Sequence, residues 1–500
     1  MPETQSPSET IGRSGIPAAD VTVAGLREAL SSGRLTSAEI VRFYLDQIAA
    51  RNAGAGAVIS VSQDAMEQAE AADRARVAGT PLGPLAGIPV LLKDNISAAG
   101  APATAGSLAL ASAAAQDAFC VGKLRAAGVI IAGKANLSEW ANFRSTHSTS
   151  GWSTLGGQAV NPHGQGRNPS GSSSGSAVAV AAGLTPLAIG TETDGSIVSP
   201  SHACGIVGVK PTLGLVSRSG IVPISAAQDT AGPMARSVAD AAALLGALAG
   251  ADPADPATEG AAGQAADYTS FLDEAALAGA RIGIWRAGSA GATPAAAAVL
   301  DEAVVVLRDH GAVIVDPVDL DGADKIGAPE FLALRHEFKD DLNAYLAGLG
   351  GEHPGSLAGL IEFNATHAER ALAHFGQEIF EQAEATSGRH DPRHGEARAD
   401  ALGLARSALD GALTAHRLDA ILALTGSPAW LTDYVLGDHY AFATSSPAAV
   451  AGYPAITVPA GKVSGLPVGV SLMGPAWSEP RLLALAYAFE QAAARHRRPA

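Results

Sequence analysis

The sequence PSGSSSGSAVAVAAGLTPLAIGTETDGSI, residues 169–197, joins a loop of serine and glycine to two apolar segments. Small apolar residues over 176–183 predict a helix, and the apolar run at 187–190 predicts a short strand. A second turn with glycine and serine follows this strand directly. Helices that alternate with short strands are typical of α/β proteins. The stretch therefore predicts an α/β fold with glycine–serine turns next to buried elements.

The same alternation continues on both sides of this stretch. Further helices are expected at 237–248, 294–310 and 482–493. Further strands are expected at 57–61, 88–92, 129–132, 206–209, 281–285, 312–315, 420–424 and 455–458. Apolar runs at 456–459 and 467–472 flank a glycine-containing segment at 461–465, which predicts a hairpin. A hairpin pairs antiparallel strands, so the expected sheet is mixed.

The composition indicates a folded, acidic protein. Of the 500 residues, 47% are apolar and only 16% are charged, which excludes wholesale disorder. The formal net charge is −16, whereas phosphate binding needs a basic surface, so nucleic acid is not the expected partner. The two cysteines, Cys120 and Cys204, are too few for a disulfide framework, and no Cys-His zinc pattern is present. Two buried thiols are expected rather than a bridge.

The first segment, residues 1–20, is polar and rich in Ser, Thr and Pro, and we expect it to be disordered. It has neither the basic region nor the apolar region of a signal peptide. The longest apolar run, residues 241–251, is too short to cross a bilayer. We therefore expect a cytoplasmic protein that does not act at a membrane.

Lys93 ends an apolar run that begins at Ile88. Burial disfavours the charged form of a lysine and can lower its pKa by several units. A lysine at the end of a buried strand is therefore a candidate general base. The alternative is a lysine whose amine reaches solvent or pairs with the neighbouring Asp94.

The serine-rich loop at 169–176 allows several interpretations. A flexible linker is disfavoured because a helix follows at once, whereas a tight turn whose hydroxyl groups cap that helix is compatible with the sequence. Gly171, Ser173 and Gly175 also match the nucleophile elbow of α/β hydrolases. That elbow needs a strand just before the serine, and residues 161–168 are polar. A phosphate-binding loop does not fit, because no Gly-Lys-Ser/Thr sequence follows.

The turn at 190–197, GTETDGSI, follows the predicted strand. A glycine immediately before a serine, here Gly195 and Ser196, lets the backbone bend sharply, so that successive N–H groups can point at one spot. An oxyanion hole is built in this way. The alternative is an ordinary turn between a strand and a loop.

Together these three segments resemble the amidase signature family, which uses a Ser–cis-Ser–Lys triad. The matching positions are Lys93, Ser172 and Ser196. Lys93 and Ser172 are 79 residues apart and Ser172 and Ser196 are 24 apart, separations similar to those of the family. Flanking segments that also match lie at 133–136, 205–212, 232–236 and 451–454.

The resemblance implies the amidase signature fold, a large mixed β-sheet covered on both faces by α-helices, in a single domain over residues 21–500. The motif-bearing core is expected at about 83–245, and residues 255–445 are expected to cover the cleft and set substrate choice. Within the family the chain is most similar to bacterial peptide amidases, on the segments 136–144, 190–198 and 476–480. Enzymes of that type remove the C-terminal amide of peptides and leave internal peptide bonds intact.

Four residues depart from the broad family pattern. Ser170 and Ser174 stand where many members have glycine, and Asp194 stands where many have the first glycine of the turn. Val198 stands where many have an arginine, two residues after the expected nucleophile. An apolar residue there suits a neutral, peptide-like substrate better than a small amide that carries a carboxylate.

The resemblance also implies a mechanism and a set of site residues. Ser196 is expected to attack the amide carbonyl, and its proton is expected to pass through Ser172 to a neutral Lys93. The peptide bond between Gly171 and Ser172 is expected to be cis. The expected oxyanion donors are the backbone N–H groups of Thr193, Asp194, Gly195 and Ser196.

The expected substrate contacts are made by Ala141, Asn142 and Phe143, which align with a segment that lines the acyl pocket, and by Ser173, which is expected to bond near the triad without reacting. Asp229 is expected to have a structural hydrogen-bonding role. The substrate is expected to be a peptide or small-molecule amide, with no metal and no organic cofactor. A monomer or a homodimer is expected.

Four other functions stay open on the sequence. The first is a general hydrolase of small aliphatic or aryl amides. The second is an amidotransferase subunit that works within a complex. The third is a catalytically inactive scaffold, and the fourth is an elbow hydrolase that uses Ser173 and a distant histidine such as His439.

Overall fold

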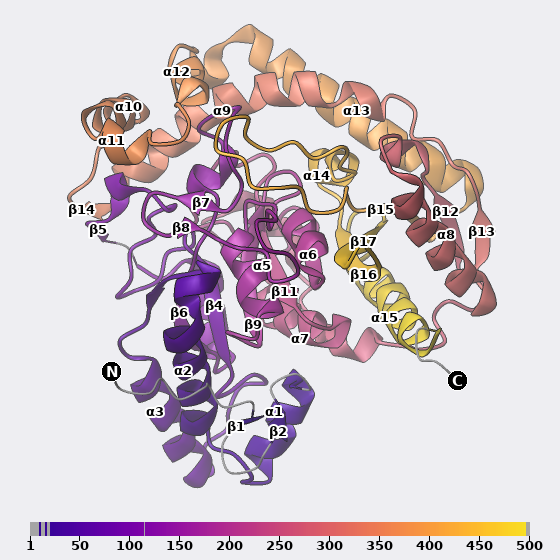
Figure 1. Ribbon diagram of the computed structural model, residues 1–500, viewed down its shortest axis with the longest axis horizontal. Helices are drawn as coiled ribbons and strands as arrows, with labels where there is room; N and C mark the ends of the chain where they lie inside the picture. Colours follow the sequence, from indigo (N-terminus) through magenta and orange to yellow (C-terminus); the bar gives the residue numbers. More distant parts are fainter. Residues whose placement is uncertain (1–9, 12–15, 18–20, 115, 497–500) are drawn as a thin grey trace.

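Eleven strands form one mixed sheet in the computed structural model, which describes residues 10–11, 16–17, 21–114 and 116–496 (Figure 1). The strand order is β13-β12-β15-β17-β16-β10-β11-β9-β4-β6-β3. These strands are β3 (Val58–Val61), β4 (Pro89–Lys93), β6 (Ile130–Ala135), β9 (Leu187–Glu192), β10 (Val207–Lys210), β11 (Thr230–Ala235), β12 (Arg281–Ile284), β13 (Val313–Val315), β15 (Ala420–Leu424), β16 (Ala455–Val463) and β17 (Leu466–Met473). Three short pairs lie outside this sheet: β1 (Thr10–Ile11) with β2 (Ile16–Pro17), β5 (Ala113–Ala114) with β14 (Gly350–Gly351), and β7 (Trp152–Ser153) with β8 (Gly157–Gln158).

The helices between these strands cover the sheet and extend beyond it. They are α1 (Val23–Ser31), α2 (Ser37–Ala55), α3 (Ala65–Val77), α4 (Phe119–Ala126), α5 (Ser174–Ala181), α6 (Val198–Cys204), α7 (Val238–Leu248), α8 (Pro294–Asp309), α9 (Gly327–Ala347), α10 (Leu357–Thr366), α11 (Ala368–Ala371), α12 (Glu378–Glu384), α13 (Pro392–His416), α14 (Ser446–Ala451) and α15 (Glu479–His496).

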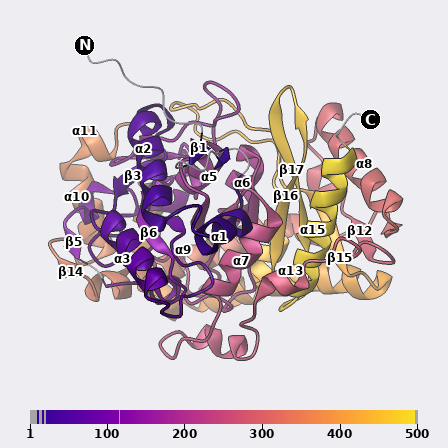
Figure 2. The ribbon, with the colours of Figure 1, turned by 90° about the horizontal axis from the view of Figure 1, so that it is seen from below.

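Side chains along the strands alternate between the two faces of the sheet, as the period of a strand requires. Leu187 and Ile189 of β9 belong to the same hydrophobic cluster as α7, α8 and α15, whereas Ala188 packs in a second cluster with α5. Figure 2 shows α8 and α15 beside the β16–β17 hairpin. Helices therefore cover both faces, and the predicted fold is confirmed.

The predicted hairpin is present, but its strands are longer than expected. The turn is Ser464–Gly465, with φ of +51° and +85°, rather than the five residues 461–465. Two residues with positive φ make the tight turn whose twist matches that of paired strands. Gly461 marks a register shift within β16, so the sequence extends past it as strand.

Strands β4, β6 and β9 position the segments singled out in the sequence. β4 pairs in parallel with β9 and with β6, so Lys93 at the end of β4 and Glu192 at the end of β9 lie at the same edge of the sheet. The loop before α5 and the turn after β9 meet at this edge. This placement is typical of α/β sheets, whose sites form outside the carboxyl ends of the strands.

Part of the region 255–445, which is expected to cover the cleft, is built into the main sheet. β12, β13 and β15 lie inside it and extend the main sheet, so that part of the region belongs to the core. The remainder includes α9 and α13, which pack side by side along one edge of the molecule (Figure 1).

The predicted disordered segment, residues 1–20, lies mostly outside the described residues. Where it is described, the structure differs from that expectation, because β1 and β2 pair antiparallel. Ile11 is buried in the main hydrophobic cluster. Cys120 and Cys204 are buried free thiols, as predicted.

Among the residues that the structure describes, no helix is both long enough and apolar enough to span a bilayer.

Candidate active site

Lys93 lies at the end of β4 with its side chain fully buried. Its Nζ is 2.8 Å from Ser172 Oγ, 2.8 Å from Thr191 Oγ1 and 3.1 Å from the Thr191 carbonyl oxygen. Burial lowers the pKa of Lys93 from 10.5 to about 7, although the nearby carboxylates of Asp229 and Glu192 act in the opposite direction. A large fraction of Lys93 is therefore neutral near pH 7 and able to accept a proton.

The loop before α5 presents Ser172 to this amine. The peptide bond between Gly171 and Ser172 is cis. The loop is fixed on both sides, because Ser138 N donates to Ser172 O at 3.0 Å and Ser173 N donates to Ser196 O at 3.1 Å. The second of these bonds joins the loop to the turn after β9.

The turn from Thr193 to Ser196 exposes four successive N–H groups that have no acceptor within the described part of the chain. Buried backbone N–H groups are almost always paired with protein or with water, so groups without a protein acceptor are available to a bound ligand. Gly195 adopts φ +81°, which favours glycine and bends the chain sharply. This geometry fits the oxyanion hole that the sequence predicts.

The carboxylate of Glu192 binds the two residues that follow this turn. Its Oε2 accepts from Ile197 N at 2.8 Å and from Val198 N at 3.0 Å, at the start of α6. Burial raises the pKa of the Glu192 carboxyl, and the positive charge of Lys210 opposes that change. The next N–H groups after the turn are thus held in place while the four before them stay free.

Thr193 is held by two consecutive residues. Its Oγ1 donates to Asp229 Oδ1 at 2.5 Å, and its carbonyl oxygen accepts from Gln228 Nε2 at 2.9 Å. Asp229 Oδ2 accepts in turn from Ile224 N and Ser225 N. Burial raises the pKa of Asp229 to about 6. This is the structural hydrogen-bonding role expected for Asp229.

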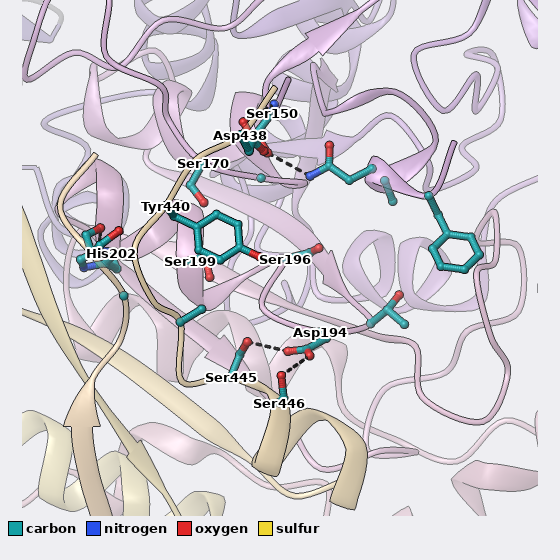
Figure 3. A pocket seen from close by; sticks show the side chains of 18 of the residues that line it. Ser150, Ser170, Asp194, Ser196, Ser199, His202, Asp438, Tyr440, Ser445 and Ser446 are labelled. Atoms are coloured by element: carbon teal, nitrogen blue, oxygen red, sulfur yellow. Dashed lines mark hydrogen bonds between the residues drawn. The ribbon is translucent and has the colours of Figure 1, made fainter. Parts of the chain in front are cut away.

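A cavity of about 290 Å³ opens in front of the turn (Figure 3). Ser196, which is 9% exposed, lines this cavity, and its hydroxyl group makes no hydrogen bond within the described residues. Ala141, Asn142 and Phe143 line it as well. Ser173 is not among the lining residues, because its buried hydroxyl donates to Thr191 O at 3.1 Å and accepts from Thr191 N at 3.2 Å. The structure therefore does not support a direct substrate contact by Ser173.

Lining residues that the sequence did not indicate come largely from the loop between β15 and α14. Ser445 and Ser446 donate to the two carboxylate oxygens of Asp194, each at 2.5 Å (Figure 3). Burial raises the pKa of Asp194. These two bonds fix the side chain of Asp194 at the wall of the cavity, so the carboxylate does not bond to the N–H groups of the turn.

Asp438 anchors the same loop beside the cavity. Its carboxylate accepts from Ser150 N at 3.0 Å, from Ser150 Oγ at 2.5 Å and from Trp430 Nε1 at 3.1 Å. The loop is also bonded to the segment that precedes the cis peptide bond, because Asn168 N donates to Trp430 O at 2.7 Å. No sequence motif marks these residues, so only the fold reveals them.

His202 of α6 also lines the cavity. Its Nδ1 accepts from Gly469 N at 2.8 Å, so Nε2 carries the proton and donates to Ser427 O at 3.0 Å. Burial lowers the pKa of His202 to about 4, so it is neutral near pH 7. Both ring nitrogens are occupied, which makes His202 a structural support rather than a base.

The sequence profile of the Amidase family matches residues 39–483, which is most of the chain. The chain belongs to the amidase family.

Solved structures of amidases share its fold. Peptide amidase from Stenotrophomonas maltophilia is 49% identical and has a TM-score of 0.91, with 97% of this chain and 99% of that chain covered. An amidase family protein from Bacillus anthracis is 34% identical with a TM-score of 0.86, over 96% and 92% of the two chains. These likenesses and the family match show that the protein is an amidase, a hydrolase of amide C–N bonds.

Curated relatives of this amidase include two kinds of protein. A probable amidase of Arabidopsis thaliana is 42% identical over 489 residues, which covers 95% of this chain and 90% of the relative. A glutamyl-tRNA(Gln) amidotransferase subunit of Symbiobacterium thermophilum is 34% identical, over 96% and 98% of the two chains.

Proposed function

We propose that this amidase removes the C-terminal amide group of peptides through Ser196, Ser172 and Lys93. The observation that carries the proposal is the buried contact between Lys93 Nζ and Ser172 Oγ, beside a turn whose four N–H groups are free. The likeness to solved peptide amidases, at 49% identity, supports the substrate class.

Ser196 Oγ attacks the carbonyl carbon of the amide, and its proton passes through the Ser172 hydroxyl to neutral Lys93. N–H groups of the turn bind the resulting oxyanion, and the loss of one such donor typically costs roughly 3–4 kcal/mol of transition-state stabilisation. The relay then returns a proton to the amide nitrogen, the C–N bond of the tetrahedral intermediate breaks, and ammonia leaves as the Ser196 ester, the acyl-enzyme, forms. Water attacks the acyl-enzyme by the same route, and the peptide leaves with a free carboxylate.

The relay requires a hydrogen bond between Ser196 Oγ and Ser172 Oγ. Catalytic hydrogen bonds are often long in the absence of substrate and tighten only when it binds. Both serines lie on segments held together by the bond from Ser173 N to Ser196 O, which keeps these two segments adjacent.

The charge of the cavity supports an uncharged substrate. Among the described residues that line it, the ionisable groups include the carboxyls of Asp194 and Asp438, and no lysine or arginine is present. Val198, where many relatives have arginine, is buried in an apolar cluster. A substrate that carries a carboxylate close to its amide has no cationic partner here.

Substrate profiling tests this proposal. We expect ammonia release from an N-blocked dipeptide amide, with no cleavage of its internal peptide bond by mass spectrometry. Malonamate and benzamide serve as comparison substrates, and we expect kcat/KM to be lower for both. A higher kcat/KM for malonamate or benzamide would contradict the proposal and indicate that the substrate is a small amide.

The relatives named as amidotransferase subunits favour a second candidate, a subunit that takes ammonia from glutamine. Glutamine carries a carboxylate, which the cavity is poorly equipped to bind. Hydrolysis of peptide amides by the purified chain alone, with no hydrolysis of glutamine, decides against this candidate.

A further inference from the structure

Gln228 connects the expected oxyanion turn to two helices of the outer layer. Its Nε2 donates to Thr193 O at 2.9 Å and to Glu330 Oε1 of α9 at 2.6 Å. Its Oε1 accepts from Arg398 Nη1 of α13 at 2.8 Å. The side chain is 3% exposed, so these bonds are made away from solvent.

The orientation of this side-chain amide is fixed by its partners. A guanidinium can only donate, so the atom that faces Arg398 must be the oxygen. A backbone carbonyl can only accept, so the atom that faces Thr193 must be the nitrogen. All three bonds therefore depend on a single orientation of Gln228.

Arg398 is itself held in place. Its Nε donates to Glu337 Oε1 at 2.8 Å and its Nη2 donates to Glu337 Oε2 at 2.5 Å. Ser225 Oγ donates to Glu337 Oε2 at 2.5 Å and His394 Nε2 lies 2.9 Å from Glu337 Oε1. Glu337 therefore holds the guanidinium of Arg398 through two bonds, while a third nitrogen of that guanidinium faces Gln228.

The carbonyl oxygen of Thr193 and the N–H of Asp194 belong to the same planar peptide unit. A donor on that carbonyl therefore fixes the direction of the N–H and strengthens it as a donor, because hydrogen bonds in a chain polarise one another. The Asp194 N–H is one of the four free groups of the turn.

We propose that Gln228 is a positioning residue for the oxyanion hole, which aims the Asp194 N–H from a support built by α9 and α13. This inference rests on the proposed function, since it assumes that the turn binds the oxyanion. It also gives the outer helices a role in the chemical step, in addition to covering the cavity.

The experiment compares Gln228→Leu with a control, Gln377→Leu. Gln377 is also a buried glutamine of the outer layer, bonded to Asn364 Nδ2 and to Ile361 O, and it has no bond to the turn. The measurements are kcat and KM for an N-blocked dipeptide amide, and the inhibition constant of the matching peptide aldehyde. Ser196 Oγ adds to the carbonyl carbon of the aldehyde, and the former carbonyl oxygen of the adduct occupies the oxyanion hole.

We expect Gln228→Leu to lower kcat roughly tenfold or more, with little change in KM, because an oxyanion donor acts on the transition state. The affinity for the aldehyde is expected to fall by the same factor as kcat/KM. Gln377→Leu is expected to leave all three quantities unchanged. A normal kcat, a change confined to KM, or an unchanged aldehyde affinity in Gln228→Leu would overturn the inference.

A second variant covers the case in which Gln228→Leu does not fold. Gln228→Glu keeps the size of the side chain and the acceptor for Arg398, but it places an oxygen against Thr193 O. We expect the same loss of kcat, and a kcat equal to that of the unchanged chain would overturn the inference. If the unchanged chain releases no ammonia from peptide amides, the proposed function and this inference fail together, whereas normal turnover in both variants removes only the inference.

Discussion

Lys93 Nζ and Ser172 Oγ lie 2.8 Å apart, although 79 residues separate them in the sequence. Lys93 is positioned by the end of a buried strand, and Ser172 is positioned by a loop tied to the neighbouring turn. The contact is sealed from solvent, which lowers the pKa of Lys93 to about 7. A buried amine with a hydroxyl partner is therefore able to work as a base at neutral pH.

The pH dependence of the reaction follows from this pKa. The base must be neutral, and burial lowers the pKa of Lys93 to about 7, so we expect kcat/KM to rise with pH and to level off above about that pH. Below that pH the rate is expected to fall about tenfold per unit, as the protonated form takes over. The measurement is kcat/KM for a blocked dipeptide amide from pH 5 to 9. A rate that stays level across pH 5 to 7 would contradict a lysine base.

Ser172 and Ser173 are neighbours with different environments, so their alanine variants should differ. Ser172 Oγ contacts Lys93 Nζ, whereas the bonds of Ser173 Oγ to described residues are all to the backbone of Thr191. We expect Ser172→Ala to lose at least about 10³-fold in kcat, since members of a triad act as a unit. Ser173→Ala is expected to retain far more activity. Equal losses in the two variants would count against the assignment of Ser172 to the relay.

The Thr193 hydroxyl is expected to matter for both stability and rate. Thr193→Val removes the donor to Asp229 Oδ1 and leaves a buried carboxylate oxygen without that partner. We expect a loss of about 1–3 kcal/mol in the free energy of unfolding. The rate is expected to fall as well, because Thr193 begins the oxyanion turn. Thr366→Val is the control, since that hydroxyl is exposed and bonds only within its own helix. Equal effects of the two substitutions would contradict this role.

A buried ion pair close to Lys93 makes a prediction about stability alone. Lys134 Nζ lies 3.0 Å from Asp94 Oδ1, and both side chains are 1% exposed. Lys134→Met leaves the Asp94 charge buried without its partner, so the free energy of unfolding should fall by about 3–5 kcal/mol. Arg34→Met, which breaks an exposed pair with Glu28, should cost less than about 1 kcal/mol. Urea denaturation of both variants measures the difference, and similar losses would contradict it.

The sequence predicts much of the sheet, because local signals mark it. Apolar runs next to a glycine identify strands such as β4 and β9. The family was also predictable, since three short motifs in a fixed order carry it. These features depend on residues that are close together in the chain.

The part of the cavity wall built by the loop between β15 and α14 was not predictable, because its contacts join distant segments. Asp438 meets Ser150 across 288 residues, and Ser445 meets Asp194 across 251. Ser150, Asp438 and Ser445 belong to no local motif. The support of Thr193 by Gln228 is of the same kind, since Arg398 enters from a helix 170 residues away. Tertiary packing alone brings such side chains together.

Ammonia release from an N-blocked dipeptide amide tests the central claim most directly, with the unchanged chain measured beside Ser196→Ala and Lys93→Ala. We predict release by the unchanged chain and a loss of at least about 10³-fold in each variant. Undiminished release by either variant would contradict the Ser–Ser–Lys mechanism, and no release by the unchanged chain would contradict the peptide amide as its substrate.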